Sequence, residues 1–413
     1  MTDGRPESPR FVSDPPRFIR CARARDQLDH TPVDRIEVAG RVVFSEPGST
    51  LIADDSGTLE VGLADPVPIG SFIEVALSPS GASVIHLGAP PMRPFPVPDG
   101  DWLAVHGGRR LEALKARAAL RTAVRAWYEH ADFLEVETPI AVPSPGLDLH
   151  LDAVEARGLG APRWLGTSPE YQMKRLLAAG LPRIVQLQRC FRRGERGARH
   201  EPEFTLLEWY RAPGDADDVM RDTEHLVASC AESLLGSTVI PARGRPVDVS
   251  PPWERVTVAE AFQRYAGVSV TDVLPDEERF FRILIEDIEP HLGHPHPVFL
   301  TRWPASMASL ARLCPDDTAW AERFEAYVDG MELCNGFGEL IDPVEQRARL
   351  VRDREARRSE DLPAYPLDER FVGALEEGIP RAGGNALGFD RLLMLLLGLD
   401  HIEQALPFPQ SRL

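Results

Sequence analysis

The sequence lacks the features that would place it in a membrane or in an oxidising compartment. Its five cysteines are far apart in 413 residues, so no C-x-x-C pair supports a zinc knuckle or a redox motif. No run approaches the roughly 18–20 apolar residues that span a membrane, and the first twenty residues have no apolar signal-peptide core. We therefore expect a cytoplasmic protein with reduced cysteines and no membrane partner.

Lysine is almost absent, since Lys115 and Lys174 are the only two among 46 basic residues. The formal net charge is −18, and a broadly acidic surface disfavours non-specific nucleic-acid binding. Three common motifs are also missing: the G-x-x-x-x-G-K-[ST] loop, a G-x-G-x-x-G turn between a strand and a helix, and His-Glu-x-x-His. The usual phosphate-cradling loops and zinc hydrolases therefore lose support.

What the chain does contain changes in character along its length. Residues 1–32 are polar and rich in Pro and Arg, and we expect a flexible segment with a short helix. Residues 33–90 hold five short segments that alternate apolar and polar side chains, which predicts an antiparallel β-module. Five strands in about 55 residues suit an OB-like β-barrel. A fragment of a β-sandwich is the alternative.

The remainder is predicted to be a linker and a larger domain. Residues 91–107 are rich in Pro and Gly, which favours a linker. From residue 108 to residue 413, helical periodicity begins and strands are mixed with helices without a regular βαβ alternation. This pattern predicts an α+β domain in which helices flank an antiparallel sheet.

Residues 189–211 (RCFRRGERGARHEPEFTLLEWYR) carry the clearest nucleotide-binding signal. An apolar strand runs into an arginine cluster, and after a polar loop a second strand alternates acidic and aromatic residues. Arginines are permanently charged donors to phosphate, and a ring such as Phe204 can stack on a base. Taken alone, a solvated charged hairpin explains the pattern equally well.

Two further segments are individually weak. Residues 330–342 (GMELCNGFGELID) place Glu332 and Glu339 seven positions apart, and carboxylates are ligands for the magnesium that accompanies phosphates. Paired surface acids are the alternative there. Residues 383–397 (GGNALGFDRLLMLLL) lead glycines into an apolar helix with Asp390 and Arg391 near its start. A buried Arg391 would need an anionic partner, and a simple ion pair at a helix start is the alternative.

In this order, the segments resemble the motifs of class II aminoacyl-tRNA synthetases. FLEVETP (133–139) resembles motif 1, residues 189–211 resemble motif 2, and residues 383–397 resemble motif 3. TSPEYQMKRLL (167–177) and ELCNGFGEL (332–340) resemble the lysine branch, and within it the ligases that attach β-lysine to a lysine of elongation factor P. The resemblance implies the class II fold, ATP as substrate, Mg²⁺ and a homodimer.

The resemblance also implies roles for individual residues. Arg192 would hold the α-phosphate of ATP, and Arg391 would hold the γ-phosphate and cover adenine opposite Phe204. Glu332 would act with these two arginines in catalysis and would bind Mg²⁺ together with Glu339. The implied ATP-binding set is Arg192, Glu195, His200, Phe204, Glu332, Leu333, Gly388 and Arg391.

Lysine and β-lysine carry two ammonium groups, so their pocket should be acidic. The implied substrate-binding set is Ser168, Glu170, Glu208, Tyr210, Asn335, Glu339 and Ala386. Ala386 is informative because lysyl-tRNA synthetases usually have glycine at this position, whereas the elongation-factor ligases have alanine. One methyl group shifts discrimination by about 1–3 kcal/mol, so Ala386 favours β-lysine without proving it.

Two positions depart from motif 2. Gly194 stands where an acid commonly contacts the adenine amino group, so that this acid is either Glu195 or missing. Glu201 stands where asparagine is familiar, and its charge would repel a triphosphate unless magnesium or Arg199 offsets it. These departures affect the adenine and loop contacts rather than the family resemblance.

The predicted function is ATP-dependent activation of lysine or (R)-β-lysine and its transfer to elongation factor P. A tRNA-charging ligase is the first alternative, suggested by the OB-like module. It is disfavoured because residues 1–100 hold fourteen acids against nine arginines, and Phe44 and Phe72 are the only aromatic residues among the strands. A non-catalytic amino-acid-binding protein is the second alternative. The acceptor and the role of the module stay open.

Overall fold

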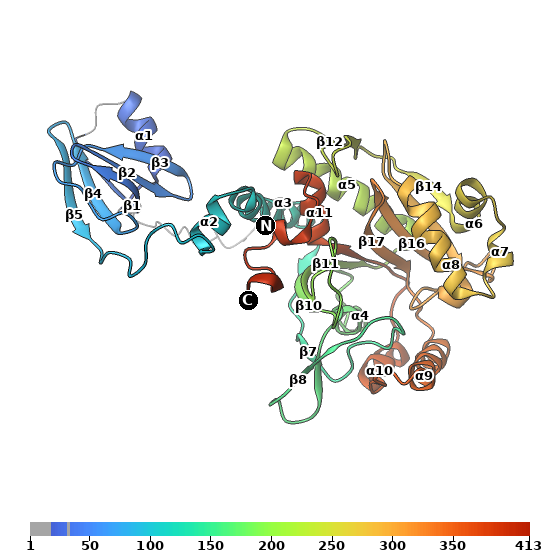
Figure 1. The fold of residues 1–413 in the computed structure, drawn as a ribbon. Coiled ribbons are helices and arrows are strands. Elements are labelled where there is room, and N and C mark those ends of the chain that lie inside the picture. The colour runs from blue at the N-terminus through green and yellow to red at the C-terminus, as the bar shows by residue number, and fades with distance from the viewer. Residues whose placement is uncertain (1–17, 31–33) are drawn as a thin grey trace, which may run out of the picture. The chain divides into compact units, whose positions relative to one another are not determined.

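The computed structural model describes residues 18–30 and 34–413 (Figure 1). The chain divides into two compact units, residues 1–111 and 112–413. Among the described residues, no helix is long and apolar enough to cross a membrane, and the cytoplasmic location stays a prediction. The five cysteines all lie in the described ranges, where they are buried and form no disulfide.

The N-terminal unit contains a five-stranded antiparallel sheet with the strand order β3-β2-β1-β4-β5. The strands are β1 (Ile36–Glu46), β2 (Ser49–Asp54), β3 (Gly57–Val61), β4 (Phe72–Ser78) and β5 (Gly81–Leu87). Burial alternates along β1, so that Val38 and Val42 join a core with Cys21 and Ala24 of helix α1 (Cys21–His30). One apolar face of the sheet is thus packed against a helix.

The structure confirms the predicted antiparallel sheet but not its closure. Strands β3 and β5 are the two edges of this sheet, and within residues 34–111 no hydrogen-bonded ladder joins them. The OB-like barrel therefore stays a prediction.

The segment predicted as a linker contains a helix, α2 (Asp101–His106). This helix begins after Gly100, beyond the last proline of the segment. Trp102 stacks on His106 with 3.9 Å between ring centroids and meets Phe95 edge-on at 5.4 Å. Aromatic contacts therefore order a segment whose Pro and Gly content suggested neither helix nor sheet.

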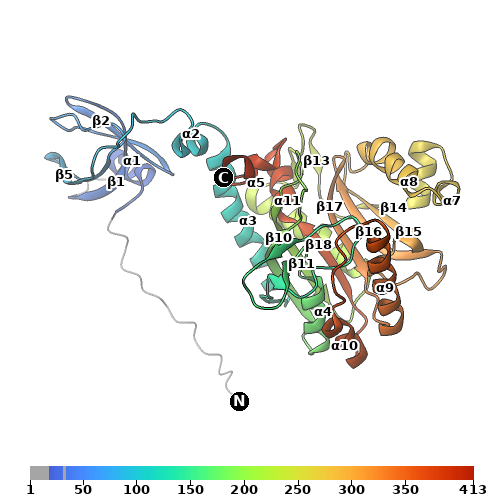
Figure 2. The same ribbon diagram turned by 60° about the horizontal axis from the view of Figure 1, so that its bottom comes forward.

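The second unit is built on an eight-stranded sheet with the order β14-β15-β16-β17-β18-β11-β10-β6. Figure 2 shows strands of this sheet with helices beside them. Its strands are β6 (Leu134–Glu135), β10 (Arg183–Phe191), β11 (Glu203–Arg211), β14 (Glu254–Thr257), β15 (Val298–Pro304), β16 (Trp320–Val328), β17 (Met331–Gly338) and β18 (Gly383–Gly388). The pairs β6–β10 and β14–β15 are parallel, and the other five pairs are antiparallel. This confirms the predicted α+β core.

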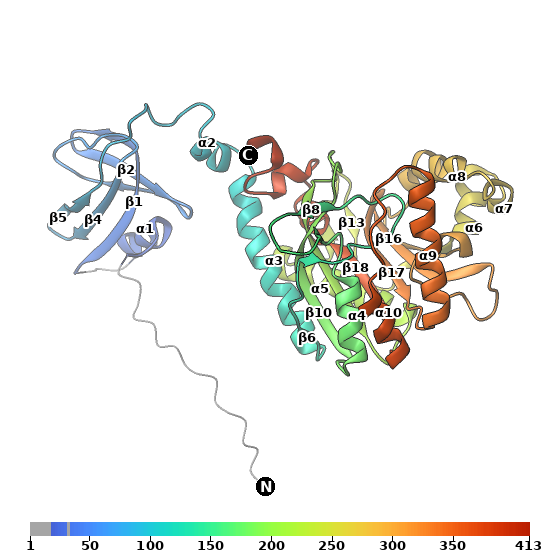
Figure 3. The same cartoon turned by 90° about the horizontal axis from the view of Figure 1, so that it is seen from below.

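Helices pack on both faces of this sheet (Figure 3). Helices α3 (Arg110–His130), α5 (Ala216–Leu235) and α11 (Phe389–Leu397) share one hydrophobic core with it. Helices α4 (Glu170–Ala178), α9 (Pro343–Ser359) and α10 (Glu369–Glu377) share a second core. Along β11, Leu207 and Trp209 belong to the first core and Tyr210 to the second. The two-residue period of the strand separates them.

Short elements complete the unit. Strands β7 (Ala141–Val142), β9 (Arg163–Leu165) and β8 (Val154–Ala156) form a small sheet, and β12 (Val239–Ile240) pairs with β13 (Val247–Asp248). Helices α6 (Val258–Ala261), α7 (Val270–Val273) and α8 (Glu277–Ile283) share a third hydrophobic cluster with β15. Single turns are η1 (Phe262–Ala266), η2 (Leu284–Ile288), η3 (Glu289–His291), η4 (Ala305–Met307), η5 (Ile402–Ala405) and η6 (Gln410–Arg412).

Candidate active site

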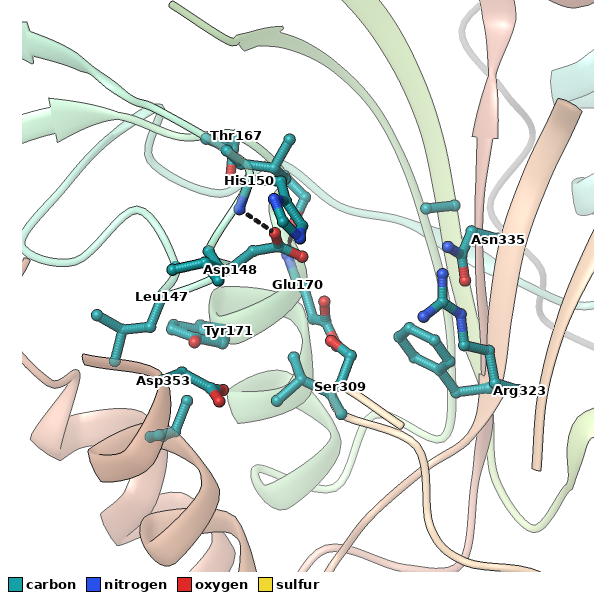
Figure 4. Close-up of a pocket in the computed structure, with 18 of the residues that line it drawn as sticks. Leu147, Asp148, His150, Thr167, Glu170, Tyr171, Ser309, Arg323, Asn335 and Asp353 are labelled. Atoms are coloured by element: carbon teal, nitrogen blue, oxygen red, sulfur yellow. Dashed lines mark hydrogen bonds between the residues drawn. The ribbon is translucent and has the colours of Figure 1, made fainter. Parts of the chain in front are cut away.

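A cavity of about 470 Å³ opens on the α4 side of the large sheet, and Figure 4 draws many of its lining residues. Its floor consists of side chains from three neighbouring strands. Ala386 of β18 lies in register with Glu208 of β11 on one side and with Asn335 of β17 on the other. Strand alternation therefore brings together three residues that are far apart in the sequence.

The predicted acidic residues gather at one end of this cavity. Glu170, Glu208 and Glu339 all line it, although they come from α4, β11 and the end of β17. The Tyr210 hydroxyl donates to Glu208 Oε1 at 2.6 Å, whereas the buried Glu208 Oε2 has no hydrogen-bond partner. An unpaired buried carboxylate oxygen is costly, so this atom is available to a cationic ligand.

Burial changes how these acids titrate. Burial, reinforced by the charge of Glu170, raises the pKa of Glu208 well above its ordinary value. Burial also raises the pKa of Glu339 to about 7, although the ammonium of Lys174 opposes the shift. Both carboxyls therefore hold their protons to higher pH than usual, and a bound ammonium group would favour their ionised forms.

Arg323 and Asn335 lie together on another wall of the cavity (Figure 4). Both donate to Glu325 Oε1, Arg323 Nη2 at 2.7 Å and Asn335 Nδ2 at 3.2 Å. Asn335 Oδ1 is buried without a partner. Glu325 thus fixes the asparagine amide with its nitrogen occupied and its oxygen free to accept a hydrogen bond.

Arg192 lies at the end of β10 and lines the same cavity. Its guanidinium stands 4.9 Å from the centroid of the Phe204 ring and 3.7 Å from a carboxylate oxygen of Glu195. Its Nε is buried without a partner. One face of Phe204 is therefore covered by Arg192, and this arginine keeps a free donor for an anion.

A second cationic residue of the site, Arg391, lies near the start of α11. Its Nη1 donates to the backbone oxygen of Glu332 at 2.8 Å and to Glu332 Oε2 at 3.1 Å. Its Nη2 lies 2.6 Å from His200 Nε2. Burial and the neighbouring Arg391 lower the pKa of His200, so a neutral imidazole accepts from the guanidinium.

The structure does not bring Glu332 and Glu339 together. Glu332 pairs with Arg391, whereas Glu339 pairs with Lys174. Seven residues of extended strand separate two side chains by on the order of 20 Å, far beyond the span of one ion. Among the described residues, no group of three or more Asp, Glu, His or Cys side chains forms a metal cage. The joint magnesium role of these two acids therefore loses its geometric support.

The other predicted residues lie as follows. Ser168 lines the cavity, and its hydroxyl accepts from the backbone of Glu170 at 3.3 Å. Leu333 is buried in the core on the far face of the sheet, so only its backbone is available. Gly388 precedes α11, where a Cβ would stand 3.3 Å from the Arg391 side chain.

The two departures in motif 2 have local explanations. Gly194 has a φ of +80°, a conformation that glycine adopts readily. Glu201 is 4% exposed, and its Oε2 accepts from the backbone of Gln410 at 3.0 Å. The Glu201 carboxylate therefore holds the C-terminal segment.

Asp390 serves the structure rather than the cavity. It forms a buried ion pair with Arg117 of α3 and accepts from the backbone of Thr205 at 2.6 Å. The ion pair considered as an alternative for this helix start is thus present.

The charged residues of the site that sequence reasoning missed include Lys174, Glu289, Arg323 and Glu325. Lys174 has a readable signal, because it follows Glu170 by four positions on a helix. Glu325 has none, since only the pairing of β16 with β17 places it opposite Asn335. Burial and the charge of Glu332 raise the pKa of Glu325 and of Glu289 to about 7. Glu289, Glu325 and Glu332 therefore share one electrostatic environment.

Comparison with known proteins places this geometry in a family. Residues 100–412 match the class II tRNA synthetases of the D, K and N type, and the chain belongs to this family. Similar proteins from Proteus mirabilis and Hamiltonella defensa are each 38% identical over 309 residues. One from Klebsiella pneumoniae is 39% identical over 312 residues. Each match covers 72% of this chain and 95% of the relative, and all three relatives are named elongation factor P–(R)-beta-lysine ligase.

Proposed function

We propose that this chain uses ATP to activate lysine or (R)-β-lysine and transfers it to a lysine side chain of elongation factor P. The observation that carries the proposal is one cavity with Glu170, Glu208 and Glu339 at one end and Arg192 also in its lining. The charges of an amino acid with two ammonium groups and one carboxylate are complementary to this arrangement. The names of the relatives support the same substrate and acceptor.

In the activation step, a carboxylate oxygen of the amino acid attacks the α-phosphorus of ATP. The bond from this phosphorus to the bridging oxygen breaks, and pyrophosphate leaves with the electron pair. Arg192 and Arg391 would neutralise the charge that develops on the phosphoryl oxygens. Asn335 Oδ1 would accept from the substrate. The protein adds no nucleophile, so that positioning and charge neutralisation carry the rate.

The donor set fits Mg²⁺ at the phosphate end. A magnesium ion bound with phosphates uses one or two protein carboxylates, and Glu332 would supply one, with Glu325 as its neighbour. The charge of Glu332 helps to raise the pKa values of Glu325 and Glu289, and this repulsion among the carboxylates favours a cation there. Bound magnesium supplies neutralisation of phosphate charge.

In the transfer step, the neutral amine of the acceptor attacks the carbonyl carbon of the adenylate, and AMP leaves. The cavity is also lined by Asp148, Glu277 and Asp353, of which Asp148 and Glu277 are exposed. Their negative charge favours the approach of a cationic lysine side chain. Burial, reinforced by Asp148, raises the pKa of Asp353, which suits this carboxylate to receive a proton from the acceptor ammonium.

Pyrophosphate exchange tests this proposal directly. Purified protein should incorporate labelled pyrophosphate into ATP with (R)-β-lysine or α-lysine and with no neutral amino acid. Labelled amino acid should then appear on elongation factor P and be lost when its acceptor lysine is replaced. Exchange with neither amino acid would remove the enzymatic function, and exchange without labelling would leave activation but remove this acceptor.

Charging of tRNA is the second candidate, because the N-terminal sheet exposes aromatic rings. Phe72 is 59% exposed and Phe44 is 45% exposed, and exposed rings can stack on unpaired bases. Salt-sensitive binding of tRNA, lost when Phe72 is changed to Ala, would favour this candidate. Labelling of elongation factor P with no labelling of tRNA would dismiss it.

We also propose a homodimer and retain the domain boundaries expected from the sequence, 33–90 for the OB-like module and 108–413 for the catalytic domain. Strand β6 is an edge of the large sheet, and its Leu134 is 53% exposed. Ile140, beyond the same motif, is 40% exposed. Apolar side chains next to an open strand edge suit a partner surface. Sedimentation of the wild type and of Leu134→Arg would test the dimer.

A further inference from the structure

Lys174 is a buried ammonium that lies behind the acidic end of the cavity. Its side chain is 1% exposed, and Nζ lies 2.7 Å from Glu170 Oε1 and 2.5 Å from Glu339 Oε2. Both glutamates line the cavity, whereas Lys174 does not. Burial alone would lower the pKa of Lys174, but the two carboxylates outweigh it and raise the pKa, so the ammonium stays charged.

This ammonium changes the charge that the cavity offers to a ligand. Glu170, Glu208 and Glu339 supply three carboxylates when ionised, and Lys174 cancels one of these charges. At this acidic end of the cavity two negative charges remain, which equals the two ammonium groups of lysine or β-lysine. A buried excess charge is far more costly than a surface one, so the match between pocket and ligand decides which amino acids bind.

We propose that Lys174 is a specificity-determining counter-ion that fixes Glu170 and Glu339 and sets the pocket to two negative charges. The inference rests on the proposed function, because it takes a diamino acid as the substrate. Lys174 would not touch the substrate and would act through the two glutamates.

The choice of lysine at this position supports the role. The chain uses arginine almost everywhere, and Lys174 is one of only two lysines. Its Nζ lies 6.0 Å from the ring centroids of both Tyr210 and Phe371. A compact point charge fits between two carboxylates and two rings, whereas a guanidinium is a wider planar fork. The space around this position therefore favours the smaller ammonium of lysine over the guanidinium of arginine.

A purely structural ion pair that only ties α4 to the sheet is the competing explanation. The two explanations differ in pH dependence. If Lys174 sets the charge, Lys174→Met should leave an additional carboxyl that takes up a proton. This proton takes the place of the ammonium charge at low pH and is lost at high pH, where three carboxylates face the two ammonium groups of a diamino acid. A structural role would change affinity equally at every pH.

The experiment compares Lys174→Met with Lys115→Met, which makes the same substitution on an exposed part of α3. Exchange is measured with lysine and (R)-β-lysine from pH 6 to 9. We expect the ratio of the amino-acid KM of Lys174→Met to that of the wild type to change about tenfold or more between pH 6.5 and pH 9, with a smaller change in kcat, because the additional carboxyl is protonated at the lower pH and charged at the higher pH. Lys115→Met should match the wild type.

A second measurement does not depend on activity. The Tm of the ligand-free protein is followed over the same pH range for the wild type, Lys174→Met and the double variant Lys174→Met/Glu339→Gln. The Tm of Lys174→Met should fall more steeply with rising pH than the Tm of the wild type, because carboxyls without their ammonium partner ionise in a buried site. The double variant removes one acid with the ammonium and should regain a wild-type slope in both Tm and log KM.

The outcomes separate the two proposals. Parallel pH profiles for the wild type and Lys174→Met, in KM and in Tm, overturn the counter-ion role whatever the size of the uniform change. If Lys174→Met does not fold, a double variant with a slope steeper than that of the wild type overturns it as well. A wild type that activates neither amino acid removes the proposed function, while the Tm profiles still report on the counter-ion.

Discussion

The two ends of the site hold their charges in different ways. At the amine end, Glu208, Glu339 and Lys174 are each 1% exposed and lie on a strand, at a strand end and on a helix. At the phosphate end, the side chains of Arg391 and Glu332 are 17% and 36% exposed. Arg391 is held there in part by a backbone oxygen, that of Glu332. The end proposed to choose between amino acids is dry, and electrostatic discrimination is strong where water is excluded.

The phosphate end should show the largest effect, because in the proposed mechanism it neutralises charge that develops in the reaction. Arg391→Met is expected to lower kcat for pyrophosphate exchange by about 10²–10³-fold, the cost typical of losing one preorganised donor to developing charge. Arg221→Met is a matched control, since Arg221 lies exposed on α5 and pairs with Asp218. A loss of less than about tenfold would mean that Arg391 only binds ATP.

The amine end should instead change the KM for the amino acid. Glu208→Gln keeps the shape of the side chain but removes the carboxylate whose Oε2 is unpartnered, so the KM should rise by about 30–100-fold, as when a buried charged contact is lost. The KM for ATP should stay within about twofold. Glu203→Gln, on the exposed end of the same strand, should behave as the wild type. An equal rise in the KM for the amino acid and in the KM for ATP would mean that the two ends of the site do not act separately.

The sequence predicts some contacts of the site better than others. The difference depends on whether the residues lie within one continuous segment of the chain. Arg192 and Glu208 lie within one segment of motif 2, so their approach to a common site follows from a single hairpin. Glu332 and Glu339 also lie in one segment, but an extended strand carries them to separate clusters. The counter-ion position of Lys174 and the contact of Glu325 with Asn335 depend on how α4 and β16 pack, which no local pattern encodes.

Substitution at the floor of the cavity tests how finely the dry end discriminates. Ala386 lines the cavity and lies in register between Glu208 and Asn335, so with the proposed substrate its methyl group would set the depth at which the amino acid rests. Ala386→Gly should shift the ratio of kcat/KM for (R)-β-lysine over α-lysine toward α-lysine by about 1–3 kcal/mol. An unchanged ratio would place the choice between the two isomers elsewhere in the cavity.

The pH dependence should also differ between the two ends. The pKa of Glu339 in the folded protein is about 7, raised by burial from an ordinary value of 4.5. The stability contribution of this carboxyl is thus complete below pH 4.5 and is lost as pH rises through 7. Bound ammonium groups favour the ionised form, so the KM for the amino acid should fall severalfold between pH 6 and 8. The KM for ATP should not follow it. A parallel fall in both would point to a group shared by the two ends.

The smallest effect is expected from Glu201, although it belongs to the motif that surrounds the triphosphate. Its carboxylate is buried, and its Oε2 accepts from the backbone of Gln410, so this oxygen is already engaged by the C-terminal segment. Glu201→Gln should therefore change the KM for ATP by less than about threefold, because an amide can still accept the same hydrogen bond. If this carboxylate faced the phosphates, removing its charge would tighten ATP binding by about tenfold, since each 1.4 kcal/mol of repulsion corresponds to that factor. A lowered KM would mean that the C-terminal segment releases Glu201 when ATP binds.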